Sequence, residues 1–126
     1  MKNVIIWATI RTGRTYTAKK IREAIGDRVG AIAVVDEIYA TAKPNFGDAI
    51  VVGMGFTSTG EALLKLMQEK KDDKALLGLE WAKKVCADNV ELKKNCAKWG
   101  IKYFDTTGKE ADVFIPQIVE FVKKSI

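Results

Sequence analysis

The segment that decides the fold is "IIWATIRTGRTYTAKKI", residues 5–21. It begins with an apolar run typical of a strand buried on both faces, turns around Gly13, and continues with Ala18 and Ile21 at helical spacing. A buried strand that leads through a short turn into a helix is the opening unit of a parallel α/β sheet. The segment therefore predicts a strand over 3–8 and a helix over about 15–26, which Gly26 ends.

The same alternation continues along the chain. Further strands are expected at "GAIAVVDEI" (30–38), "DAIVVGMGF" (48–56), "KALLGLEW" (74–81) and "IKYFDTTG" (101–108). The first of these is expected to be buried, like residues 3–8. The fold class that this pattern predicts is α/β: a three-layer α/β/α arrangement around a largely parallel five-stranded sheet, with residues 1–126 as one domain. Ligands of such sheets bind beyond the carboxyl ends of the strands.

Three more helices are expected between and after these strands. One is capped by Ser58 or Thr59 and runs to about Lys71, and a second ends at Gly100 with a break near Asp88-Asn89. The last helix should begin near Asp112, because Pro116 fits a first turn, where backbone N–H groups lack partners within the helix. Gly53, Gly55 and Gly60 are read as sites of close strand–helix packing and a turn.

Composition excludes several classes of protein. The chain has 126 residues, 48% of them hydrophobic and 29% charged, and its apolar runs are much shorter than the roughly 20 residues that cross a bilayer. The N-terminus leads directly into the patterned turn, which does not resemble a signal peptide. Cys86 and Cys96 have a spacing that fits no metal or redox motif, and the chain has no histidine. We therefore expect buried, reduced thiols in a cytoplasmic protein.

The net charge of +5 comes mainly from scattered lysines, which are typical of a solvated surface. Neither a nucleic-acid partner nor a membrane is indicated, and a homodimer stays open. The arginines are gathered near the N-terminus, at positions 11, 14, 22 and 28. Arg11 and Arg14 fall in the turn after the first strand.

That turn, residues 9–15, predicts an anion site. Backbone N–H groups at a helix N-terminus and the helix dipole point at the same place, and guanidinium groups bind phosphate well. The residues expected to hold a phosphorylated ligand are Thr9, Ile10, Arg11, Thr12, Gly13, Arg14, Thr15 and Tyr16. The alternative is a plain connection whose arginines face water.

The stretch resembles the phosphate-binding P-loop (Walker A) of small nucleoside and nucleotide kinases. Ala8 stands where the first glycine belongs, Gly13 at the second, Arg14 at the lysine and Thr15 at the magnesium-ligating hydroxyl. "VVDEIYATAKP" resembles the acceptor-site turn of those kinases, and "NCAKWGIKYFDTTGKEADVFIPQIVEFV" resembles their last strand and closing helix.

This resemblance implies ATP or GTP bound with Mg²⁺. Thr15 would ligate the metal. Asp36 and Arg14 would be the catalytic residues, since Asp36 would position or deprotonate the acceptor hydroxyl and Arg14 would hold the phosphates. Asp105 and Thr106 would border the base. Ala8 and Arg14 depart from the motif, so both an active phosphotransferase and a binding protein that has lost turnover remain open.

A second resemblance is to flavodoxin-like proteins. "RTGRT" (11–15) is similar to the "TGNT" turn that wraps the phosphate of FMN, and "DAIVVGMGF" is similar to their third strand. This resemblance implies an FMN-binding electron-transfer protein, with Phe56 or Trp81 as the aromatic cover of the flavin.

Overall fold

The computed structural model describes residues 1–126 as an α/β fold with an all-parallel sheet and four α-helices. The strands are β1 (Val4–Ala8), β2 (Ile32–Val35), β3 (Ile50–Gly55) and β4 (Tyr103–Asp105). The α-helices are α1 (Arg14–Ile25), α2 (Gly60–Glu69), α3 (Gly78–Trp99) and α4 (Ala111–Ser125), and two 3₁₀ segments are η1 (Gly26–Arg28) and η2 (Asp73–Leu77). The first, second, third and last predicted strands are thus confirmed.

The strand order is β2-β1-β3-β4. The central strand β1 pairs with β2 on one side (Val4↔Ile32) and with β3 on the other (Val4↔Ile50). The short strand β4 pairs only with the second half of β3, from Gly53 to Gly55. Because all strands are parallel, the loops that follow β1, β3 and β4 meet at one edge of the sheet.

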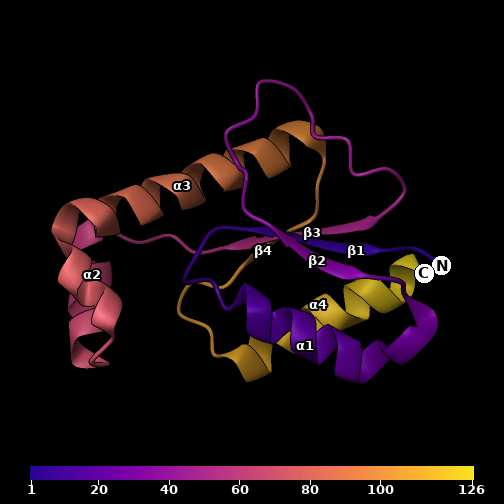
Figure 1. The fold of residues 1–126 in the computed structure, drawn as a ribbon, viewed down its shortest axis with the longest axis horizontal. Helices are drawn as coiled ribbons and strands as arrows, with labels where there is room; N and C mark the ends of the chain where they lie inside the picture. The colour runs from indigo at the N-terminus through magenta and orange to yellow at the C-terminus, as the bar shows by residue number, and fades with distance from the viewer.

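Helices cover the two faces of the sheet unequally (Figure 1). α1 and α4 lie together against one face, and α3 crosses the other, while α2 stands away from the sheet and packs on the start of α3. The two chain ends lie close together, and the Nζ of Lys2 donates to the backbone oxygen of Ser125 at 3.3 Å. None of the helices combines the length and the apolar character needed to cross a membrane.

The core beneath α1 and α4 is built mainly from apolar side chains. Strand residues such as Ile6 and Val52 pack there against Ile21 of α1 and Ile118 of α4, all of them fully buried. Complete burial of side chains of this size contributes about 1.5–3 kcal/mol each. This face therefore provides the rigid support for the loops at the sheet edge.

The opposite face is built around Trp7. Its ring is completely buried, lies edge-on to Phe46 at 5.7 Å and stacks with Trp99 at 6.2 Å between centroids. Its Nε1 donates to the backbone oxygen of Glu37 at 3.0 Å. Trp7 thereby fastens the long loop 36–49, which connects β2 to β3 without a helix.

The exposure of β2 corrects one expectation. The sequence predicts β2 as a buried strand, but Ala33 and Val34 are exposed in the structure. β2 is the outermost strand, and a loop replaces the crossover helix that usually covers such a strand. Its apolar residues therefore remain half covered.

The predicted strand at residues 74–81 is wrong, and the sheet has four strands, not five. The Asp72 side chain accepts a hydrogen bond from Lys74 N at 2.9 Å and starts η2, which leads directly into α3. α3 also continues through Asp88 and Asn89 without the predicted break. The sequence predicts that Pro116 lies in the first turn of the last helix. Because α4 begins at Ala111, Pro116 lies beyond that turn.

The reading of the glycines as close-packing positions is confirmed. A Cβ built on Gly53 would lie 2.5 Å from Cys96 Sγ and 3.3 Å from the backbone oxygen of Lys102. At Gly60 the Cβ would lie 3.1 Å from backbone atoms of Lys83, where α2 meets α3. Only glycine allows these elements to approach so closely.

Gly53→Ala is therefore expected to lower the free energy of unfolding by about 2 kcal/mol, because one methyl group overpacks a closed core. Urea denaturation measures the loss. In the double variant with Cys96→Ala, removal of the Sγ relieves the clash, so the two effects should be smaller together than their sum. Strict additivity would contradict this packing.

The buried thiols predict a loss of stability in alkali. Burial raises the pKa of Cys96 to about 12 and also raises the pKa of Cys86. Because the pKa of Cys96 is raised in the folded state, the protonated thiol contributes fully to stability below the unfolded pKa, near 9. This contribution is lost as pH rises toward 12. The free energy of unfolding should fall between pH 9 and 11 by up to about 1.4 kcal/mol per pH unit for Cys96, measured by urea titration. A flat profile would contradict it.

Candidate functional site

A cavity of about 540 Å³ lies at the carboxyl ends of β1, β3 and β4. This volume is within the range of pockets that hold small molecules. The cavity is bordered by the loops after these three strands and by the helices α2 and α4. Its lining residues are Arg11, Thr12, Gly13, Phe56, Thr57, Ser58, Leu63, Leu66, Lys70, Thr106, Thr107, Gly108, Lys109, Glu110 and Phe114.

The loop after β1 is tightly folded. Arg11 and Gly13 have φ values of 66° and 79°, in the left-handed region that glycine adopts easily and other residues rarely. The hydroxyl of Thr12 donates to the backbone oxygen of Thr9 at 2.9 Å and is buried. These features bend the chain sharply, so that α1 begins at Arg14, immediately after Gly13.

This bend leaves a run of backbone N–H groups without partners. None of the N–H groups from Ile10 to Tyr16 donates a hydrogen bond within the protein, and the first to do so is that of Thr17, to the oxygen of Gly13 at 2.9 Å. Gly13, the N-cap of α1, supplies no side chain to satisfy them. Free amides at the positive end of a helix dipole favour an anion.

The loops after β3 and β4 are held to each other by hydrogen bonds. Thr106 donates to the oxygen of Gly55 through its N–H at 2.8 Å and its hydroxyl at 3.1 Å. Thr57 N donates to the Oγ1 of Thr107 at 2.8 Å, and this hydroxyl in turn donates to Asp105 Oδ1 at 2.5 Å. The Thr107 hydroxyl and N–H together hold the pKa of Asp105 below its usual value. The wall opposite the first loop is therefore ordered.

Three cationic residues and one acidic residue, Glu110, line the cavity. Arg11, Lys70 and Lys109 line it, from three different segments of the chain. Arg11 also forms an ion pair with Asp72, which lies just after α2. An anionic ligand would therefore meet both the amides and these cations.

Arg14 lies in a different direction. Its Nη1 donates to the backbone oxygen of Ala8 at 3.1 Å and lies 3.5 Å from Asp36 Oδ2, at the end of β2. Both residues were predicted to be catalytic, and the structure brings them together. The pair lies outside the cavity lining, so Arg14 is not one of the cavity's cations.

The other predicted residues divide between the cavity and its surroundings. Arg11, Thr12, Gly13 and Thr106 line the cavity, whereas Thr9 is buried beside it. The side chains of the remaining predicted residues are exposed: Ile10, Thr15, Tyr16 and Asp105. For these four residues, contact with a ligand stays a prediction. The contact would be made by the backbone, or by a side chain that moves when the ligand binds.

Sequence reasoning missed the apolar side of the cavity. Leu63 and Leu66 come from α2, Lys70 follows the last residue of α2, and Phe114 comes from α4. Their helical spacing predicts only that they lie on one face of a helix. Which helix leans over the sheet edge depends on tertiary packing, so no local signal could have found them.

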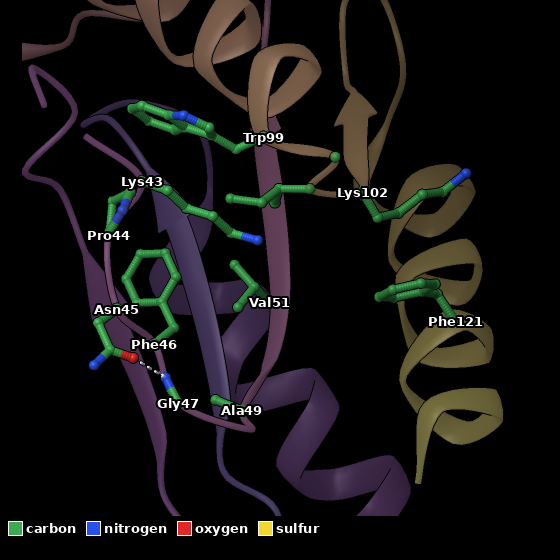
Figure 2. Close-up of a pocket in the computed structure, with 12 residues that line it drawn as sticks. Lys43, Pro44, Asn45, Phe46, Gly47, Ala49, Val51, Trp99, Lys102 and Phe121 are labelled. Atoms are coloured by element: carbon green, nitrogen blue, oxygen red, sulfur yellow. Dashed lines mark hydrogen bonds between the residues drawn. The ribbon is translucent and has the colours of Figure 1, made fainter. Parts of the chain in front are cut away.

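A second hollow, of about 630 Å³, lies at the other end of the sheet (Figure 2). Figure 2 shows Phe46 of loop 36–49 and Phe121 of α4 on either side of Val51, with Trp99 above them. This hollow borders the amino-terminal half of β3, away from the loops that follow the strands. Ligands of open α/β sheets bind at the carboxyl ends, which favours the 540 Å³ cavity as the functional site.

No protein-family model matches the chain, and no curated protein matches it in sequence.

Proposed function

We propose that the chain binds a phosphorylated mononucleotide in the cavity at the carboxyl ends of β1, β3 and β4. The observation that carries the proposal is the run of unpaired N–H groups from Ile10 to Tyr16. Such groups are costly to leave unsatisfied when a site closes over them, and phosphate oxygens satisfy several at once. Arg11, Lys70 and Lys109 add the positive charge that a phosphate dianion needs.

The strand order favours FMN as the mononucleotide. The order β2-β1-β3-β4 is that of flavodoxin-type sheets, whose FMN lies at the point between the first and third strands where the chain reverses its direction across the sheet. Here the loops after β1 and β3 both border the cavity. The similarity of "RTGRT" to the flavodoxin phosphate turn supports the same ligand.

The residues present fit FMN. The free amides 10–16 would hold its phosphate, and Phe56, Leu63, Leu66 and Phe114 offer apolar surface for its ring system. Bound FMN supplies reversible one- and two-electron transfer. The chain's own part is to orient the ring and to exclude water from it.

A kinase-like nucleoside triphosphate site is the second candidate. The contact between Arg14 and Asp36 at 3.5 Å favours it, because it places the two predicted catalytic residues together at neighbouring strand ends. In that case the exposed Thr15 hydroxyl would ligate Mg²⁺ and Asp36 would face the acceptor. Release of Arg14 from Asp36 would be required before it could reach a phosphate.

Titration with FMN, riboflavin, and ATP or GTP with and without Mg²⁺ tests the proposal. We expect FMN to bind at least about 100-fold more tightly than riboflavin, since the phosphate forms several charge-assisted hydrogen bonds. Fluorescence of the flavin measures both affinities. Equal affinity for the two flavins would refute a phosphate site, and binding of ATP that requires Mg²⁺ without binding of FMN would favour the second candidate.

A further inference from the structure

Two asparagines on α3 are almost completely buried. Asn89 is 1% exposed and Asn95 is 4% exposed. Asparagine is a poor residue for a helix interior, and a buried amide is costly unless it is hydrogen-bonded. Leucine has a higher helix propensity and is more favourable in an apolar core, so the hydrogen bonds of each asparagine must compensate for its presence.

Asn89 connects two of the three loops that border the cavity, those after β1 and β3. Its Nδ2 donates to Thr9 Oγ1 and to the oxygen of Val85, each at 2.9 Å. Its Oδ1 accepts a hydrogen bond from the N–H of Phe56 at 3.1 Å. Thr9 opens the loop after β1 and Phe56 opens the loop after β3, so one side chain sets the distance between them.

The surroundings leave this side chain little freedom. A Cβ built on Gly55 would lie 2.6 Å from Asn89 Oδ1 and 2.8 Å from the hydroxyl oxygen of Tyr103. That hydroxyl is buried and has no hydrogen-bond partner in the protein. The polar atoms of Asn89 and Tyr103 therefore meet at Gly55, the last residue of β3.

We propose that Asn89 is a positioning residue of the ligand site. It holds the amides that follow Thr9 at a fixed distance from Phe56, so that phosphate and ring can be contacted together. This role rests on the proposed function. Without the Asn89 amide, Thr9 and Phe56 lose their common partner, and the two loops can separate.

Asn95→Ala is a matched control for Asn89→Ala. Asn95 lies on the same helix and donates through Nδ2 to the oxygen of Ile38 at 2.8 Å, which fastens loop 36–49. Both variants should lower the unfolding temperature. Only Asn89→Ala should raise the dissociation constant of FMN, by about tenfold or more, as expected for loss of a buried hydrogen-bonded anchor. Equal effects of both variants on FMN, or none from Asn89→Ala, would overturn the proposal.

A second readout needs no ligand. In ¹⁵N-labelled free protein, Asn89→Ala should shift the amide resonances of Phe56, Thr12 and Gly13, and Asn95→Ala should leave them in place. If Asn89→Ala does not fold, Thr9→Val removes the same contact from the other side and should give the same shifts at Thr12 and Gly13. If wild type does not bind FMN, the proposed function fails, and these amide shifts alone decide whether Asn89 positions the loops. Unchanged shifts would refute that role.

Discussion

Replacing Thr12 with aspartate is expected to weaken the binding of FMN at least about 100-fold, equivalent to about 2.7 kcal/mol. Thr12 is buried, lines the cavity and lies directly before Gly13, the N-cap of α1. A carboxylate there would occupy the electropositive space meant for the phosphate and would repel it. Flavin fluorescence titration of the variant measures the loss.

Thr12→Asn is the neutral control for Thr12→Asp, because asparagine has nearly the same shape as aspartate. It should keep its affinity for FMN within about tenfold of wild type, because it adds no charge. A negative charge near the N-terminus of α1 interacts favourably with the helix dipole, so Thr12→Asp should unfold no more easily than Thr12→Asn. Equal loss of FMN affinity in both variants would contradict an anion site.

Trp7→Ala is expected to lower the free energy of unfolding by about 4 kcal/mol. Trp7 is completely buried, contacts Phe46 and Trp99, and donates to Glu37 O. Since domains are stable by only about 5–15 kcal/mol, this loss should leave the variant partly unfolded at moderate temperature. Urea denaturation followed by far-UV circular dichroism measures it.

Trp7→Phe separates the packing of the ring from its hydrogen bond. Phenylalanine keeps an aromatic ring against Phe46 but leaves Glu37 O without its donor, so we expect a smaller loss, about 2 kcal/mol. A loss below about 1 kcal/mol in Trp7→Ala would mean that loop 36–49 does not depend on this anchor.

The strands that carry the site could be predicted because each is a compact apolar run. Residues 4–8 and 50–55 are buried on both faces, and such runs are recognisable without knowledge of the fold. The run at 74–81 has the same character, yet it begins a helix because the Asp72 cap starts a turn there. A short apolar run alone does not distinguish a strand from a buried helix.

Only the part of the candidate site that lies within one strand–turn–helix segment could be predicted from the sequence. Thr12 and Gly13 line the cavity as expected, since a strand, a glycine turn and a helix follow one another in the chain. Arg14 was expected at the phosphate, but its side chain lies against Ala8 O and Asp36. The direction of the Arg14 side chain depends on Asp36, which directly follows β2. Likewise, Phe114 reaches the cavity because of how α4 packs, which the sequence does not reveal.

Strand order was equally hidden from the sequence. Both resemblances begin with the same elements, a strand, a phosphate turn and a helix, so that motif does not choose between them. The order β2-β1-β3-β4 follows from long-range pairing, such as that of Gly53 with Tyr103. The proposal of FMN in preference to a nucleoside triphosphate rests on this order.

Amide mapping by NMR tests the central claim most directly. ¹⁵N-labelled protein is titrated with FMN, and the shift of each backbone amide is followed. We predict the largest shifts at the free N–H groups of residues 10–16, with smaller ones in the loop that begins at Phe56. Shifts centred instead on the hollow at Trp99 and Lys43, or none at residues 10–16, would contradict the claim.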